Sequence, residues 1–77
     1  MASFTCILAK GGLPVEFEWV KGDDVVQSSK NIVIEKNQRT SSLIIQSVMI
    51  SNSGNYTCKA TNAFGSDMFT SQLIVEG

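Results

Sequence analysis

The fold of this chain is decided by residues 54–60, which read Gly54-Asn55-Tyr56-Thr57-Cys58-Lys59-Ala60. The tyrosine, the cysteine and the alanine occupy alternate positions, so in a β-strand their side chains point to one face, into a core. A second cysteine, Cys6, stands near the start of the chain, and Trp19 lies between the two cysteines. This order is typical of a two-sheet β-sandwich in which one disulfide joins the sheets and an indole packs against it. A tyrosine two residues before the second cysteine fits a buried ring whose hydroxyl returns to the backbone.

Short alternating runs separated by turn residues predict strands throughout and no helix. We expect strands near 4–8, 16–20, 25–26, 31–35, 42–46, 56–60 and 68–75, and a hairpin loop at 61–66. Alternation within these strands assigns the core, which we expect to contain Phe4, Cys6, Leu8, Phe17, Trp19, Ile32, Ile34, Leu43, Ile45, Tyr56, Cys58, Ala60, Leu73 and Val75.

With 77 residues the chain has room for one domain, whose core alone is a marginal source of stability. If Cys6 and Cys58 bond, closing the loop between them contributes roughly 4 kcal/mol. Two cysteines suggest an oxidising compartment, although a reduced cytosolic domain also carries such a number. The chain starts with strand-like sequence and no signal peptide. We therefore expect residues 1–77 to be one domain excerpted from a longer multidomain ectodomain.

Composition argues against several classes of function. The net charge is −1 and the basic residues are scattered, so no nucleic-acid-binding face is expected. No apolar run approaches the roughly 20 residues of a membrane span. The absence of histidine excludes histidine-based triads and histidine-ligated metals. The Asp23-Asp24 pair is interpreted as a solvated turn, because Ca²⁺ takes roughly six to eight oxygen ligands. We expect no enzymatic activity and no cofactor.

Two segments resemble the I-set of the immunoglobulin superfamily: Leu43-x-Ile45-x-x-Val48, and Gly54-x-Tyr56-x-Cys58-x-Ala60-x-Asn62-x-x-Gly65. Together with Cys6 and Trp19, the resemblance covers nearly the whole chain. It implies an all-β, immunoglobulin-like sandwich of two antiparallel sheets with Greek-key connections. The strand A or A′ that normally precedes Phe4 is largely missing, and the sheet edge left open invites pairing with another chain.

A narrower resemblance is carried by Lys10-Gly11-Gly12-Leu13-Pro14-Val15, which leads to Trp19, and by Asn55-Tyr56-Thr57-Cys58. These stretches are similar to the Down syndrome cell adhesion molecule (Dscam) family, arthropod members included, and contactin-like adhesion proteins share parts of the pattern. Dscam proteins are strings of immunoglobulin and fibronectin domains on cell surfaces that bind themselves in trans. The resemblance implies a homophilic adhesion module. Two alternatives stay open: a receptor domain for a different protein, and an intracellular muscle-type scaffold with reduced cysteines.

Two sheet faces are candidates for binding a partner. On the sheet formed by strands 4–8, 31–35 and 42–46, alternation points Thr5, Ile7, Val33, Ile44 and Gln46 outward. We expect Ile7, Val33 and Ile44 to be neighbours in an exposed apolar patch, although β-branched residues also favour strands wherever they lie. The Dscam resemblance favours this face. The alternative face, on the other sheet, consists of Glu18, Val20, Lys59, Met68 and Ile74, with Thr57, Thr70 and Gln72.

One modification signal is present. Asn55-Tyr56-Thr57 is an acceptor sequence for N-glycosylation. Because Tyr56 is expected to point inward, Asn55 is expected to point outward, where a secreted parent chain could carry a glycan.

Overall fold

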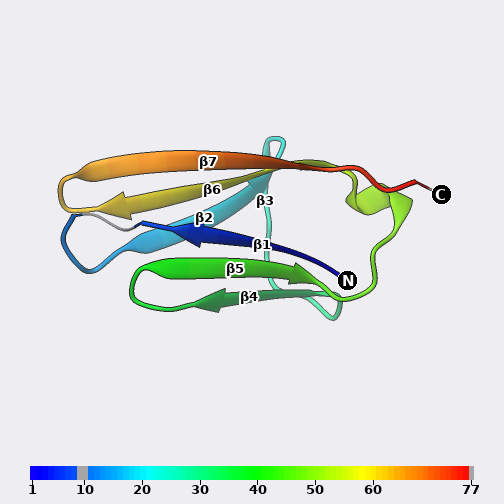
Figure 1. The fold of residues 1–77 in the computed structure, drawn as a ribbon, viewed down its shortest axis with the longest axis horizontal. Helices are drawn as coiled ribbons and strands as arrows, with labels where there is room; N and C mark the ends of the chain where they lie inside the picture. Colours follow the sequence, from blue (N-terminus) through cyan, green and yellow to red (C-terminus); the bar gives the residue numbers. More distant parts are fainter. Residues whose placement is uncertain (9–10, 77) are drawn as a thin grey trace.

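The computed structural model describes residues 1–8 and 11–76, in which the chain forms two antiparallel sheets facing each other (Figure 1). One sheet has the strand order β1-β5-β4 and the other has the order β3-β2-β6-β7. The expected all-β, immunoglobulin-like sandwich is confirmed. The elements are β1 (Ala2–Ile7), β2 (Glu16–Lys21), β3 (Asp24–Val25), β4 (Ile32–Lys36), β5 (Thr40–Ile45), a 3₁₀ turn η1 (Ile50–Asn52), β6 (Gly54–Asn62) and β7 (Gly65–Leu73).

The core lies between the two sheets and follows the alternation of the strands. In β5, Ser41, Leu43 and Ile45 are buried and the residues between them are half-buried, as expected for a strand with one covered face. The same alternation buries Tyr56, Cys58 and Ala60 in β6. Around these side chains most of the other expected inward residues are buried or packed against the core, namely Phe4, Cys6, Leu8, Phe17, Trp19, Ile32, Ile34 and Leu73. The prediction for Val75 was wrong, because β7 ends at Leu73 and Val75 lies beyond it, half-buried and outside the core cluster.

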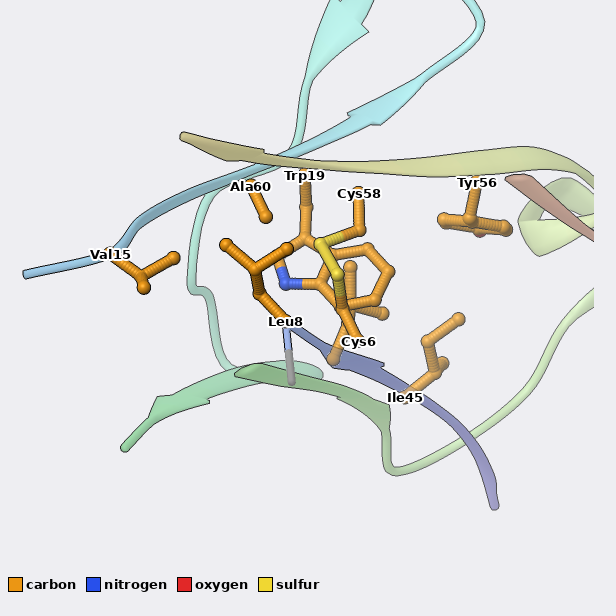
Figure 2. Packing of buried hydrophobic residues seen from close by; sticks show 9 residues of the cluster. Cys6, Leu8, Val15, Trp19, Ile45, Tyr56, Cys58 and Ala60 are labelled. Atoms are coloured by element: carbon orange, nitrogen blue, oxygen red, sulfur yellow. A yellow bond between two sulfur atoms is a disulfide. The ribbon is translucent and has the colours of Figure 1, made fainter. Parts of the chain in front are cut away.

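A disulfide between Cys6 of β1 and Cys58 of β6 joins the two sheets. Trp19 lies directly opposite Cys58 in the β2–β6 register, which places the indole beside the sulfur atoms (Figure 2). The indole Nε1–H donates a hydrogen bond of 2.9 Å to the Ser41 hydroxyl, which in turn donates to the backbone carbonyl of Glu35. Since a buried polar group without a partner is costly, Ser41 lets the indole enter the core.

Tyr56 closes the end of the sandwich opposite the β6–β7 hairpin. Its ring stacks on Phe4, with the centroids 4.9 Å apart, and its hydroxyl donates to the backbone carbonyl of Asn52. The Asn52 side chain in turn accepts a hydrogen bond of 2.7 Å from the Met49 N–H. The expected tyrosine corner is therefore confirmed, and it fixes η1 against the core.

Burial also predicts how Tyr56 responds to pH. Desolvation by burial raises the pKa of the Tyr56 phenol above its ordinary value of 10.0. The buried neutral phenol therefore contributes its full stabilisation below about pH 10, and this stabilisation is lost as the pH rises through the pKa of the folded state. Tyr56 is the only tyrosine, so near-ultraviolet absorbance reports its ionisation alone. We expect Tyr56→Phe to lower the free energy of unfolding by about 1 kcal/mol at neutral pH. Above about pH 10 we expect the free energy of unfolding of this variant to fall less steeply with pH than that of the wild type.

The comparison with Tyr56→Phe removes the contributions that other groups make to the pH dependence of stability. Urea denaturation of both proteins on either side of pH 10 makes the measurement. Parallel losses of stability in the two proteins would contradict the assignment.

Two local predictions were wrong. The chain has a helical turn, η1, which is too short to show a hydrophobic period in the sequence. The last strand runs from Gly65 to Leu73 and not from 68 to 75, so the expected loop at 61–66 shrinks to a tight turn at Ala63-Phe64. Gly65 has φ 150°, which favours glycine, and the Asn62 side chain accepts the Phe64 N–H, so these two residues support the tight turn. The other strands begin or end within about two residues of the expected positions.

One sheet has three strands and the other has four, and β7 is the last strand of the wider sheet. It pairs with β6 alone, and it lies at one edge of the molecule while β4 lies at the other (Figure 1). Phe69 stands opposite Cys58 and so shares its inward face, yet 45% of Phe69 is exposed. Within the described residues, β7 is thus an edge strand, as are β1, β3 and β4, each of which pairs with one neighbour.

Candidate interaction faces

Among residues 1–8 and 11–76, no group of three or more cysteine, aspartate or glutamate side chains is placed to hold a metal ion. No helix in the same residues has the length and apolar character needed to cross a membrane. The features left to consider are the two outer faces of the sandwich.

The first of these, the three-stranded face, is the outer surface of β1, β5 and β4. The strand register sorts its side chains into rows that cross the sheet. In one row Ser3, Ile44 and Val33 lie side by side. Gln46, two residues beyond Ile44 and just past the end of β5, is exposed. The next row contains Thr5, Ser42 and Glu35, with a hydroxyl–hydroxyl hydrogen bond of 3.2 Å between Thr5 and Ser42.

The expected apolar patch is only partly formed. Ile44 and Val33 are direct neighbours, as expected, and both are half-buried. Ile7, by contrast, lies opposite Thr40, four residues from Ile44 along β5, which corresponds to about 14 Å. The prediction that Ile7 adjoins the other two residues was wrong, because β1 and β5 are antiparallel and the register places the Thr5–Ser42 pair between them.

The second feature, the four-stranded face, is the outer surface of β3, β2, β6 and β7. One of its rows contains Glu18, Lys59 and Met68, all exposed. The adjacent row consists of Val25, Val20, Thr57 and Thr70, and a hydrogen bond of 2.9 Å joins the two threonine hydroxyls. Ile74 follows the end of β7 and is 69% exposed.

Charge distinguishes the two faces. On the three-stranded face the only ionisable side chain in the rows described above is Glu35, at the edge strand β4. On the four-stranded face a glutamate and a lysine stand opposite each other in the middle of the sheet, as Glu18 and Lys59. Glu16 of β2 also forms an ion pair at 3.6 Å with Lys36 of β4, and this pair links the two sheets. The three-stranded face is thus almost uncharged, and the four-stranded face is of mixed charge.

Several contributors to these surfaces were missed from the sequence. Ser3, Thr40 and Ser42 complete the rows of the three-stranded face, yet only the register shows that they flank Ile44 and Ile7. In the core, Val15 is 1% exposed, and the expected core did not include it. The alternation of Phe17 and Trp19, continued back by two residues, contains the signal that would have found Val15.

The sequence model of the immunoglobulin I-set domain family matches residues 1–75 of the chain. This chain belongs to the immunoglobulin I-set family. Among curated relatives, the cell adhesion molecule DSCAML1 of Homo sapiens is 39% identical over 70 residues, which are 91% of this chain and 3% of the relative. The I-set domain described here therefore spans only a small part of the length of such relatives.

Solved structures agree with this assignment. The I-set domain superimposes on the crystal structure of the Dscam1 Ig7 domain, isoform 9, with a TM-score of 0.88 and 32% identity, covering 95% of this chain and 78% of that one. It also superimposes on the I-band fragment I67–I69 from titin, with a TM-score of 0.86 and 27% identity, covering 95% of this chain and 25% of the fragment. The resemblance to Dscam inferred from the sequence is confirmed, and the fold is shared with titin.

Proposed function

We propose that this I-set domain is a recognition module of a cell-surface adhesion protein and that it binds a second copy of itself through the three-stranded face. The observation that carries the proposal is the near absence of charge on the paired strand residues of that face, among which Glu35, at the edge strand β4, is the ionisable residue within the described part of the chain. In a two-fold contact the same patch meets itself, so a charge near the axis faces a like charge. Like-charge juxtaposition costs several kcal/mol, and a face of hydroxyl and aliphatic side chains avoids it.

The area of the face sets the strength of such a contact. Three strands of about six residues present roughly 300 Å², well below the roughly 800 Å² per partner of a standard interface. One domain therefore gives a weak, transient contact. Strong adhesion requires many copies on one surface, or neighbouring domains that bind at the same time. The relatives named as cell adhesion molecules are far longer than this chain, which fits a contribution from further domains.

Bead aggregation tests the proposal because dense display compensates for weak affinity. We expect beads that carry the wild-type domain to cluster, and Ile44→Asp to lower clustering about tenfold or more, because each 1.4 kcal/mol of lost binding is a factor of ten. Thr5→Lys, on an exposed residue of the same face, gives a second variant that leaves the core untouched.

Val20→Asp is the matched control, since it introduces the same charge at a half-buried, outward valine of the four-stranded face. A thermal melt of each variant confirms folding. Clustering that survives Ile44→Asp and Thr5→Lys but disappears with Val20→Asp would move the contact to the four-stranded face. A wild-type domain that clusters only with beads carrying a different protein would make this a heterophilic receptor domain.

The likeness to titin favours one second candidate, an intracellular scaffold domain. The state of Cys6 and Cys58 in protein from the native source separates the two functions, because structural disulfides persist outside the cytosol and thiols stay reduced within it. Thiol alkylation without reductant, followed by mass spectrometry, reads that state. Two alkylated cysteines would favour the scaffold, whereas an intact disulfide leaves adhesion or binding of a different protein as the function.

A further inference from the structure

The four-stranded face carries a group whose role the proposed contact leaves unexplained. Asn55 lies in β6 between the turn residue Gly54 and the buried Tyr56, and its side chain is exposed on the outer surface. With Tyr56 and Thr57 it forms the sequence Asn-x-Thr, the acceptor for N-glycosylation. The other asparagines of the chain, at positions 31, 37, 52 and 62, lack a serine or threonine two residues later.

The surroundings of Asn55 leave room for a large substituent. On one side it lies opposite Gln72 of β7. On the other side its carbonyl accepts the N–H of Gly22, a residue without a side chain. Within residues 1–8 and 11–76 the Asn55 side-chain amide makes no hydrogen bond, whereas the amides of Asn31, Asn52 and Asn62 all bond the backbone. A substituent on the Asn55 amide therefore breaks none of the side-chain hydrogen bonds among the described residues.

We propose that Asn55 carries an N-linked oligosaccharide that covers the four-stranded face and confines recognition to the three-stranded face. In the attachment, the Asn55 amide nitrogen bonds to the anomeric carbon of a lipid-diphosphate-linked oligosaccharide. The bond from that carbon to the diphosphate oxygen breaks, the lipid diphosphate leaves, and the amide loses one proton. No oxidation or reduction is involved.

The position of the acceptor in the sheet indicates when this transfer takes place. β6 is paired on both sides, with β2 and β7, and the Thr57 hydroxyl bonds to Thr70. A transferase must bind the acceptor segment in an extended conformation and contact the Thr57 hydroxyl. Because pairing with β7 occupies both, the transfer occurs before β7 pairs with β6. The folded domain is then a poor acceptor.

The register shows what the glycan covers. Successive outward rows of a sheet lie about 7 Å apart. The row containing Val20 and Thr57 is adjacent to Asn55, and the row containing Glu18 and Lys59 is next, about 14 Å away. A branched oligosaccharide rooted at Asn55 stands over both rows. Asn55 belongs to the outer face of one sheet, so the three-stranded face, on the far side of the sandwich, stays bare. This consequence rests on the proposed homophilic function, whereas the attachment itself does not.

Attachment is tested by expressing the domain with a secretion signal in eukaryotic cells and comparing its mass before and after enzymatic removal of N-glycans. We expect a glycan on the wild type and on Thr57→Ser, which preserves the acceptor sequence, and none on Asn55→Gln or Thr57→Ala. A wild-type protein that leaves the cell with its disulfide formed and its mass unchanged by the enzyme would overturn the proposal.

Coverage is tested with the same proteins on beads, and a single substitution supplies the matched control. Ser3→Asn creates an acceptor with Phe4 and Thr5 on the three-stranded face, in the row of Ile44. We expect glycosylated wild type and Asn55→Gln to cluster within about twofold of each other, and glycosylated Ser3→Asn to lose clustering until its glycans are removed. Clustering that increases in Asn55→Gln would place the contact under the Asn55 glycan and overturn the coverage. If no protein clusters, the homophilic function fails while the mass measurement still decides the attachment.

Discussion

Replacing both cysteines, as Cys6→Ala with Cys58→Ala, is expected to lower the free energy of unfolding by roughly 4 kcal/mol. The disulfide closes a loop with a sequence separation of 52, and a cross-link of that span removes much of the conformational entropy of the unfolded chain. Small domains have about 5–15 kcal/mol of stability in total. The loss is therefore a large share of the total, and we expect the double variant to be largely unfolded at about 37 °C.

Urea denaturation at several temperatures measures this loss, and wild type kept in reductant gives a second measurement without a change of side-chain volume. The two should agree within about 1 kcal/mol. A double variant that unfolds within about 0.5 kcal/mol of the oxidised wild type would show that the core alone holds the sheets together.

Leu43→Ala is expected to lower the free energy of unfolding by about 2–5 kcal/mol. Leu43 is 0% exposed and lies in β5, which is flanked by β1 and β4 and therefore cannot move easily to fill a cavity. The cost contains the lost transfer free energy of the side chain and the cavity that remains.

The neighbouring residue provides the matched control. Ile44→Ala removes a side chain of similar size from the same strand on the outer face, so we expect it to cost less than half as much. Chemical denaturation of both variants with the disulfide intact makes the comparison. Equal losses would mean that β5 is covered on both faces, which would contradict the exposure of the three-stranded face.

Alternation along single strands was enough to predict most of the core. Cys6, Trp19, Tyr56 and Cys58 could be placed because large side chains at alternate positions must share a face. Ser41 was missed although it has the same parity as Leu43, because a serine in the core is explained only by the indole N–H that it accepts. That partner comes from the opposite sheet, so strand-by-strand inspection does not reveal it.

The candidate faces were harder to predict, since a face is assembled from residues of different strands. The alternation of side chains along each strand predicted correctly that Ile7 and Ile44 point outward. The distance between them, however, depends on the register between β1 and β5. Register is set by how the whole hydrophobic pattern of two distant strands aligns, and a short stretch of sequence does not contain it. Val33 and Ile44 were placed together correctly because a short hairpin connects their strands and restricts the register.

The connection between Cys6 and Cys58 also limits how far the domain extends under tension. The folded domain is 42 Å long, and 77 residues pulled straight would reach roughly 260 Å. The residues between the two cysteines are bypassed by the disulfide, so force applied to the chain ends straightens only the segments outside the loop, to roughly 90 Å. Within a chain of adhesion domains under load, an oxidised unit would therefore lengthen by a few nanometres and then resist, whereas the reduced one would continue to unravel.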